Sequence, residues 1–387
     1  MITSIGAPRL MEIGGGSVAR LPAVLAALDI RRPLVVSDPF LVKSGMIDRG
    51  LNPLREAGIP VHVFSDTVSD PTDTVVEAGV TVLRQGDFDG LIGFGGGSPM
   101  DTAKAIAILA AGGGKMRDWK VPARADMRAL PLVCVPTTAG TGSEATRFTV
   151  ITDTERDEKM LIAGLAALPT AAIVDWELTV GVPPRTTADT GIDSLTHALE
   201  ALVSRRANPF SDAQARAAMA LIAPNLRAVY ADGTNAAARE AMMLGATLAG
   251  LAFSNASVAL VHGMSRPVGA HFHVPHGLSN AMLLPAVTRF SLPAALPRYA
   301  DAARAMGIAS EAEGDQSAAA RLVAELEALN RELAVPTPEA YGIDKAKWDA
   351  LLPTMAEQAL ASGSPGNNPR VPTADEIVGL YRQAWAG

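Results

Sequence analysis

The residues best suited to chemistry lie between Asp193 and His276. Asp193 and His197 stand four residues apart in TGIDSLTHALEAL, whose spacing predicts a helix with both side chains on one face. His262 and His276 lie at the two ends of HGMSRPVGAHFHVPHG, a segment interrupted by Gly and Pro. One carboxylate and three imidazoles form a donor set suited to a divalent transition metal such as iron or zinc.

The distribution of histidine supports this interpretation, because four of the six histidines fall between His262 and His276. Each half of the set also has a simpler interpretation. An Asp and a His one turn apart on a helix often form only a hydrogen-bonded pair, and a His beside Gly often belongs to a turn. The two halves taken together favour a metal site.

A glycine-rich loop, GFGGGSPMD, indicates a second site that suits a nucleotide. A strand is expected at Leu91–Phe94, and a helix is expected to begin near Ser98 and Pro99 with Ser98 as its cap. Gly96 and Gly97 lack Cβ atoms, so the backbone can approach a pyrophosphate closely. The loop departs from the usual dinucleotide fingerprint, because it follows a later strand instead of the first one.

Two further features fit the same nucleotide. The loop PTTAGTGSE offers the hydroxyls of Thr137 and Thr138 after another strand, and two such loops at neighbouring strand ends would form one crevice. Asp38 ends its own strand just before Pro39. It is either a turn-forming residue or an acceptor for the adenosine ribose of NAD, where its charge would repel the extra phosphate of NADP.

The elements that must position these residues change character near residue 180. The first half alternates helical segments with short apolar runs, which predicts a parallel sheet covered on both faces. These runs occupy 33–38, 60–66, 91–94, 130–136 and 171–176. The rest of the chain has helical spacing almost to its end. We therefore expect an α/β dinucleotide-binding domain at 1–182 and an all-α metal and substrate domain at 183–387.

Composition narrows the class of protein. With 387 residues and 48% hydrophobic content, the chain can form two full-sized cores. A net charge of −7 argues against nucleic acid as a partner and against a basic membrane-binding surface. The single cysteine, Cys134, excludes an internal disulfide and is expected in a buried strand. Neither a signal peptide nor a run of ~18 apolar residues is evident, so we expect a cytoplasmic protein that does not bind a membrane.

With GGGSPMDTAK, PTTAGTGSE, the Asp193 helix and HGM…PHG in the same order, the chain resembles the iron-containing (group III) alcohol dehydrogenases from about residue 10 to 385. The resemblance implies that substrate and metal share a cleft between the two domains. It implies that the metal ligands are Asp193, His197, His262 and His276. It also implies contacts to NAD from Asp38, Asp70, Gly96, Gly97, Ser98, Asp101, Thr137, Thr138, Lys159 and Leu178.

Three positions bear on the substrate. Arg266 stands where many members of that family carry a further histidine, and it either binds an anionic group of the substrate or turns away to a structural partner. Phe148 and Phe253 would narrow the pocket, which favours a short chain. His271 and His273 are further candidates for proton relay, with surface or supporting roles as the alternative.

We therefore expect an NAD-linked, metal-dependent enzyme that interconverts a short-chain primary alcohol, with or without an anionic group, and its aldehyde. The metal, iron by resemblance with zinc able to replace it in vitro, would act as a Lewis acid on the substrate oxygen. His262, His276, Arg266 and His273 form the expected catalytic group, and a homodimer or higher homo-oligomer is expected. The alternatives are a maleylacetate reductase-like or glycerol dehydrogenase-like enzyme of the same fold, and a non-catalytic assembly protein that retains the fold.

Overall fold

The structure, a computed structural model, describes residues 2–386 and divides into two compact units. Among the described residues, one unit is Ile5–Val180, and the other consists of residues 181–386 together with residues 2–4. The expected fold class is confirmed, because the first unit contains a parallel six-stranded sheet and the second contains the helices and the cluster of Asp193 with three histidines.

The α/β unit contains eight strands. They are β1 (Leu10–Ile13), β2 (Pro33–Val36), β3 (His62–Phe64), β4 (Gly90–Gly95), β5 (Leu132–Pro136), β6 (Phe148–Asp153), β7 (Glu158–Ala163) and β8 (Ala171–Val174). Its helices are α1 (Leu21–Ala27), α2 (Pro39–Lys43), α3 (Asp48–Glu56), α4 (Asp73–Gln85) and α5 (Gly97–Gly112), with short 3-10 turns η1 (Ser17–Arg20), η2 (Met116–Trp119), η3 (Ser143–Ala145), η4 (Leu165–Ala167) and η5 (Trp176–Thr179).

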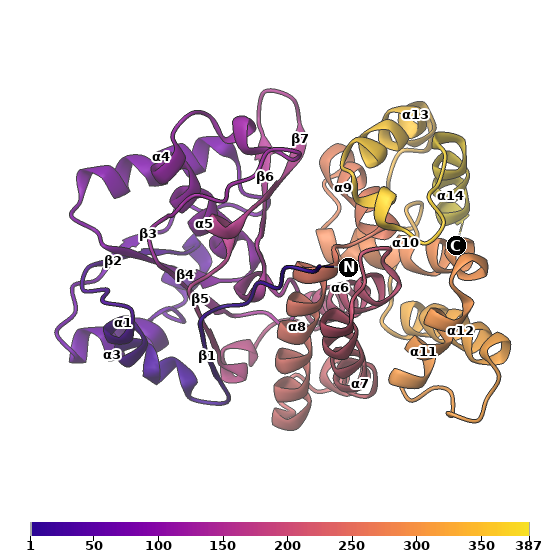
Figure 1. Cartoon of the computed structure of the whole chain (residues 1–387), viewed down its shortest axis with the longest axis horizontal. Helices are drawn as coiled ribbons and strands as arrows, with labels where there is room; N and C mark the ends of the chain where they lie inside the picture. Colours follow the sequence, from indigo (N-terminus) through magenta and orange to yellow (C-terminus); the bar gives the residue numbers. More distant parts are fainter. Residues whose placement is uncertain (1, 387) are drawn as a thin grey trace. The chain divides into compact units, whose positions relative to one another are not determined.

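Six of these strands form one parallel sheet in the order β1-β8-β5-β4-β2-β3 (Figure 1). The central strands are buried on both faces, as expected of strands that alternate with covering helices. Successive side chains point to opposite faces. In β2, for example, Leu34 and Val36 pack with α4 and α5, while Val35 packs with α1 and α3.

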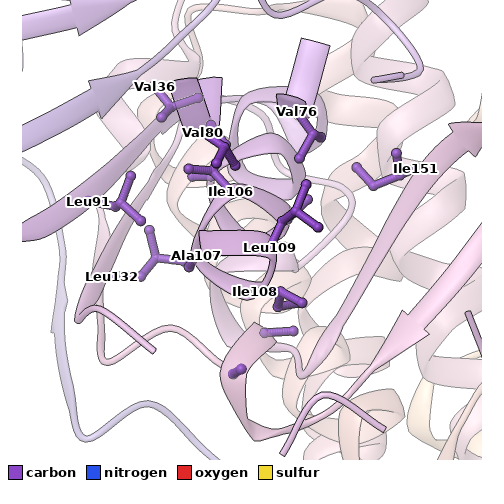
Figure 2. Close-up of a cluster of buried hydrophobic side chains, with 14 of the residues drawn as sticks. Val36, Val76, Val80, Leu91, Ile106, Ala107, Ile108, Leu109, Leu132 and Ile151 are labelled. Carbon is purple, nitrogen blue, oxygen red and sulfur yellow. The ribbon is translucent and has the colours of Figure 1, made fainter. Parts of the chain in front are cut away.

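The core on the α4–α5 face shows what holds this unit together (Figure 2). Val76 and Val80 of α4 and Ile106 of α5 pack over Leu91 of β4, and all four are buried. Complete burial of one such aliphatic side chain contributes about 1.5–3 kcal/mol. Gly79 of α4 is required by this contact, because a Cβ there would lie 2.3 Å from Cδ1 of Ile106.

The start of α5 differs from the expectation. The helix begins at Gly97 with Gly96 as its N-cap, and no side chain caps it, so the assignment of Ser98 as the cap is wrong. The next loop approaches this helix start closely, because a Cβ on Gly97 would lie 2.7 Å from Cγ2 of Thr141. Gly95 turns the chain into the helix with a φ of 149°, a region open mainly to glycine.

The structure also contains two strand features that the sequence did not predict. β6 and β7 form an antiparallel hairpin outside the main sheet. β1 joins the edge of that sheet by pairing in parallel with β8. Both strands of the hairpin pack against the α4–α5 core through residues such as Ile151 and Met160.

Among the described residues of the second unit, the regular elements are all helical. They are α6 (Pro184–Val203), α7 (Pro209–Ala231), α8 (Ala236–Ala256), α9 (Leu260–Phe272), α10 (His276–Ser291), α11 (Leu296–Ala305), α12 (Asp315–Glu332), α13 (Lys345–Ala361) and α14 (Ala374–Ala386), with 3-10 turns η6 (Leu292–Ala294) and η7 (Ser364–Asn367). Helices α6, α7 and α8 pack closely together (Figure 1). Gly191 permits this contact, because its Cβ would lie 2.3 Å from Cδ1 of Leu226.

Within residues 2–386, no single helix has the length and apolar composition needed to cross a bilayer. The pair α8 and α9, bent by 104° at the break between them, meets that test only when the two are taken together.

Candidate metal centre

Helix α6 supplies two of the expected ligands. Asp193 and His197 are both buried, and they lie one turn apart on the same face. The whole stretch from Gly191 to Val203 is buried, so α6 is a central helix of its unit. The two candidate ligand side chains are therefore held by a buried helix.

The other two candidate ligands lie at the beginnings of consecutive helices. His262 is in the first turn of α9, and His276 is the first residue of α10. His273 ends α9 in the left-handed conformation, with a φ of 55°, and allows the chain to reverse within three residues. Gly277 lets α10 approach α6, because a Cβ there would lie 2.3 Å from the carbonyl oxygen of Asp189.

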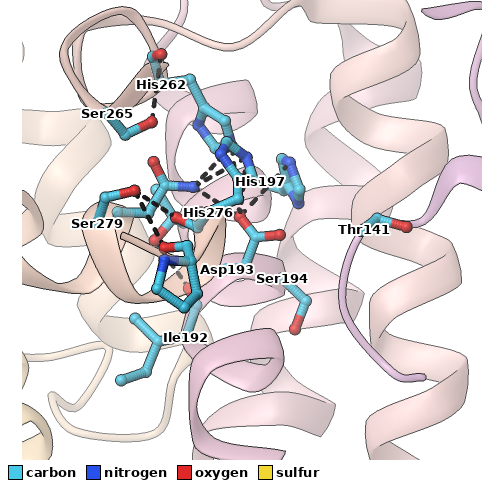
Figure 3. A network of polar contacts seen from close by, with 12 residues as sticks. Thr141, Ile192, Asp193, Ser194, His197, His262, Ser265, His276 and Ser279 are labelled. Atoms are coloured by element: carbon cyan, nitrogen blue, oxygen red, sulfur yellow. Dashed lines mark hydrogen bonds and ion pairs between the residues drawn. The ribbon is translucent and has the colours of Figure 1, made fainter. Parts of the chain in front are cut away.

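These elements bring the four ligand atoms together (Figure 3). One ligand atom from each of Asp193, His197, His262 and His276 lies within 4.8 Å of all the others. Oδ1 of Asp193 is 3.4 Å from Nε2 of His262 and 3.8 Å from Nε2 of both His197 and His276. Four ligands placed tetrahedrally around one ion at about 2.1 Å are roughly 3.4 Å apart. The observed spacing therefore fits a single divalent ion.

The side chain of Asn280 marks the point on which three of these atoms converge. Its Nδ2 lies 2.7 Å from Oδ1 of Asp193, and 3.2 and 3.3 Å from Nε2 of His262 and His276. One donor thus reaches three acceptors that all point inward. An N3O set with this convergence is chemically suited to iron(II) or zinc.

Glu200 contacts His262 on the side of the ring opposite the candidate metal site. The sequence did not indicate this residue. Its Oε2 lies 2.7 Å from Nδ1 of His262, and its carboxylate accepts hydrogen bonds from the backbone N–H groups of Ala259 and Val261 at 2.9 and 2.6 Å. Helix α9 has no side-chain cap of its own, so Glu200 both caps it and orients His262. The available signal was spacing, because Glu200 follows His197 by three residues on the buried face of α6.

Electrostatics favour an ionised Asp193. Burial raises the pKa of Asp193, but the charges of His197 and His276 and the contact with His262 lower it further, so it lies well below its usual value. Burial lowers the pKa of His262, and the contacts with Asp193 and Glu200 raise it above its usual value. The negative groups that raise it also favour a bound cation.

Two residues expected near the substrate have defined partners. Phe253 stacks on the ring of His197, with centroids 4.2 Å apart and planes 15° from parallel. Arg266 is buried and donates from Nη1 to Oγ of Ser364 at 2.8 Å. Burial lowers the pKa of Arg266 to about 10 while Glu200 acts to raise it, so the guanidinium stays charged at neutral pH.

The remaining histidine candidates lie at the end of α9. Nε2 of His271 is 2.8 Å from Oε1 of Gln358, and the His271 carbonyl accepts from Lys347. His273 is exposed and serves as the left-handed C-cap. These contacts tie the end of α9 to α13 and give His271 a structural function.

In the α/β unit, most of the expected cofactor residues follow the carboxyl ends of adjacent parallel strands. This is the edge at which open α/β sheets bind ligands. The residues are Asp38 after β2, Gly96, Gly97 and Ser98 after β4, Thr137 and Thr138 after β5, and Leu178 after β8. The two glycine- and threonine-bearing loops are joined directly, because the N–H of Thr137 donates to the carbonyl of Gly95 at 2.9 Å.

Other expected cofactor residues already have internal partners. Asp38 caps α2, since its Oδ1 accepts from the N–H of Leu41 at 2.9 Å. Nζ of Lys159 lies 2.7 Å from Oδ1 of Asp70, which has a φ of 53°. Asp101 accepts from Oγ of Ser143 at 2.7 Å and from the N–H of Val150 at 2.9 Å, so its carboxylate fixes the second loop and β6.

Phe148 opens strand β6 and is half-buried. Its carbonyl accepts from Nζ of Lys104 at 2.9 Å, and the same ammonium donates to the carbonyl and hydroxyl of Thr146, each at 3.0 Å. Lys104 is fully buried, and burial lowers its pKa despite the nearby charge of Asp101. This buried cation therefore positions the start of β6, where Phe148 lies.

Comparison with known proteins gives matches over both units of the chain. Residues 8–176 match the model of the iron-containing alcohol dehydrogenases, and residues 187–385 match the C-terminal model of the same family. The chain is 40% identical to long-chain-alcohol dehydrogenase 1 of Geobacillus thermodenitrificans (strain NG80-2), over 98% of this chain and 96% of that protein. It is 37% identical to the NAD-dependent methanol dehydrogenase of Bacillus methanolicus, over 99% and 100%.

A solved structure gives the same result at the level of the fold. The crystal structure of a 1,3-propanediol oxidoreductase superposes with a TM-score of 0.94 at 37% identity, covering 99% of this chain and 100% of the other. The chain belongs to the iron-containing alcohol dehydrogenase family. The expected class, a metal-binding oxidoreductase of an NAD-dependent family, is thereby confirmed.

Proposed function

We propose that this protein interconverts a short-chain primary alcohol and its aldehyde, using NAD(H) and one divalent metal held by Asp193, His197, His262 and His276. The observation that carries the proposal is the convergence of these four ligand atoms within 4.8 Å of one another. Iron is the metal expected from the family name, and an N3O set of this kind also suits zinc.

A bound divalent ion supplies a Lewis acid that polarises the carbonyl oxygen of an aldehyde and lowers the pKa of the corresponding alcohol. The residues of the chain define where this happens. Asp193 contributes the single negative charge of the ligand set. Glu200 holds His262 with Nδ1 bonded and Nε2 facing inward, and Phe253 holds the plane of His197 by stacking on it.

For the cofactor we propose NAD in preference to NADP. Support comes from Asp38, whose carboxylate stands at the carboxyl end of β2 on the same sheet edge as the glycine loop. The cap on α2 uses Oδ1, and a carboxylate has a second oxygen to accept from a ribose. A negative charge there disfavours a 2′-phosphate.

The substrate does not follow from the family. The relatives described above are named for long-chain alcohols, methanol and 1,3-propanediol. We propose a short, uncharged substrate, because Arg266 is buried and hydrogen-bonded to Ser364. An anionic substrate bound by Arg266 is the alternative, and it would require the guanidinium to use its other nitrogens for the anion.

A substrate screen tests the proposal. Protein stripped of metal and reloaded separately with iron(II) or zinc is assayed with NADH and a series of straight-chain aldehydes, and with NAD and the matching alcohols. We expect metal-dependent turnover that is greatest for short chains. Absence of turnover with every aldehyde and alcohol, in a sample shown to bind both metal and NADH, would contradict the proposal.

A further inference from the structure

Asn280 places an amide inside the ligand set. It lies on α10 one turn after His276 and is fully buried. Its Nδ2 is 2.7 Å from Oδ1 of Asp193, 3.2 Å from Nε2 of His262 and 3.3 Å from Nε2 of His276. A single donor group therefore contacts three of the four atoms that would bind the ion.

The neighbours of this amide determine its orientation. Its Oδ1 is buried and has no hydrogen-bond partner among residues 2–386. Reversing the amide would set that oxygen against the carboxylate of Asp193, where two acceptors repel each other. The observed orientation is thus the better one, although a buried acceptor without a donor is a cost to stability. The unpaired Oδ1 thus accompanies an orientation in which Nδ2 contacts three of the candidate metal ligands.

The tautomer of the neutral His262 ring fits this arrangement. Its Nδ1 lies 2.7 Å from the carboxylate of Glu200, which places the proton of the neutral ring on Nδ1 and leaves the lone pair of Nε2 facing Asn280. The amide carries two hydrogens. One hydrogen can be donated to the carboxylate of Asp193, and the other can be shared between the Nε2 atoms of His262 and His276.

A metal ion would need the same lone pairs. The Nε2 atom of a histidine has one lone pair, so it binds either the amide hydrogen or the ion. An oxygen of Asp193 has more than one lone pair and can keep the amide while it binds the ion. Metal binding therefore removes up to two of the contacts of Asn280 and leaves the third.

We propose that Asn280 holds the ligand set together in the metal-free protein and releases His262 and His276 when the ion binds. Contacts made only in the metal-free state stabilise that state and weaken metal affinity by the same factor. Asn280 is then a positioning residue that sets how tightly the metal is held. This inference rests on the proposed metal site but not on the proposed substrate.

The experiment uses Asn280→Leu, which keeps the shape of the side chain and removes the donor. Thermal unfolding is followed with chelator and with saturating zinc, and the zinc dissociation constant is measured by competition with a chromophoric chelator. We expect the melting temperature of the metal-free protein to fall by several degrees more than that of the zinc-bound protein. Zinc should bind about tenfold more tightly, because one to two weak hydrogen bonds no longer compete.

Asn225→Leu is the matched control, because its half-buried amide donates to the carbonyl of Leu221 at 2.8 Å within α7. It should lower both melting temperatures equally and leave the zinc affinity unchanged. Asn280→Asp provides a second variant. It adds a carboxylate beside Asp193, so it should destabilise the metal-free state further and tighten zinc binding more than Asn280→Leu does.

A measurement on the unmodified protein avoids any dependence on the folding of variants. In protein labelled with ¹⁵N at asparagine, the side-chain amide signal of Asn280 should exchange slowly without metal and shift when zinc binds. An unshifted signal, equal loss of stability in both states, or weaker zinc binding by Asn280→Leu would overturn the proposal. If the unmodified protein binds neither iron(II) nor zinc, the proposed function itself fails and the inference fails with it.

Discussion

Nδ1 of His262 lies 2.7 Å from Oε2 of Glu200, and the same carboxylate accepts the N–H groups of Ala259 and Val261. One buried side chain thus accepts hydrogen bonds from two backbone N–H groups at the start of helix α9 and orients the ring of a proposed metal ligand. The position of His262 depends on α6 as much as on α9, because Glu200 belongs to α6.

Replacing Glu200 tests this coupling. In Glu200→Gln the side chain has one acceptor oxygen for three N–H donors, and its second oxygen is replaced by an NH2 group that also donates. At least one buried N–H therefore loses its partner. We expect a loss of about 1–3 kcal/mol in the free energy of unfolding and about 10- to 100-fold weaker metal binding. Chemical denaturation and chelator competition measure the two quantities. Glu240→Gln, on the exposed face of α8, should change neither, and unchanged metal affinity in Glu200→Gln would refute the coupling.

The proposed role of Asp38 in cofactor preference can be tested separately from its role as the cap of helix α2. Asp38→Asn keeps an oxygen to cap α2 but removes the charge. We expect kcat/KM with NADPH to rise relative to NADH by about 10- to 100-fold, equivalent to about 1–3 kcal/mol. Steady-state rates with both cofactors provide the test. Equal use of NADH and NADPH by the unmodified protein would show that Asp38 does not face the ribose.

Arg266→Met distinguishes a structural role from anion binding. We expect equal changes in kcat/KM for short aldehydes with and without a terminal anion, together with lower stability from loss of the bond to Ser364. Ser364→Ala, which removes only that bond, should reproduce part of the stability loss. A selective loss for the charged aldehydes, by about 1.5–3 kcal/mol, would instead assign Arg266 to an anionic substrate.

The β6–β7 hairpin should be sensitive to acid. Burial raises the pKa of Asp153, but hydrogen bonding and charge from Arg117 and the N–H groups of Glu155 and Arg156 lower it below its usual value. A depressed pKa contributes stability above the unfolded value of about 3.9 and loses it as the pH falls through the folded value.

Asp153→Asn should therefore reduce the free energy of unfolding at pH 7, by about 1–2 kcal/mol because Arg117 is partly exposed. The difference between variant and unmodified protein should shrink below about pH 4. Denaturation at several pH values measures it. A difference that stays constant down to pH 3 would show that the ion pair does not contribute.

The parts of the site that the sequence predicted are those determined by local spacing and residue type. Asp193 and His197 share a helix face because four residues make about one turn. His262 and His276 were predicted as residue types suited to a metal, but their convergence depends on the reversal at His273 and on the missing Cβ of Gly277. Both features concern how α9 and α10 pack against α6, and this packing cannot be predicted from the spacing of residues along the chain.

The features that were missed depend on contacts between distant segments. Glu200 was passed over because an acid on a helix is usually exposed, and its donors lie 59 and 61 residues away along the chain. Strand β6 of the hairpin alternates half-buried and buried side chains because one of its faces packs on the α4–α5 core. Helix α5 begins at Gly97, earlier than predicted, and the loop that contains Thr141 approaches this residue too closely for a Cβ.

The central claim is that turnover requires one metal held by Asp193 and the three histidines. The direct measurement is the rate of NADH oxidation with a reactive aldehyde as metal-stripped protein is titrated with iron(II) or zinc, with metal content determined in each sample. We expect the rate to rise in proportion to bound metal and to level off at one ion per chain, and we expect His262→Ala to bind little metal and show little turnover while remaining folded. Full activity in protein shown to contain no metal would contradict the account.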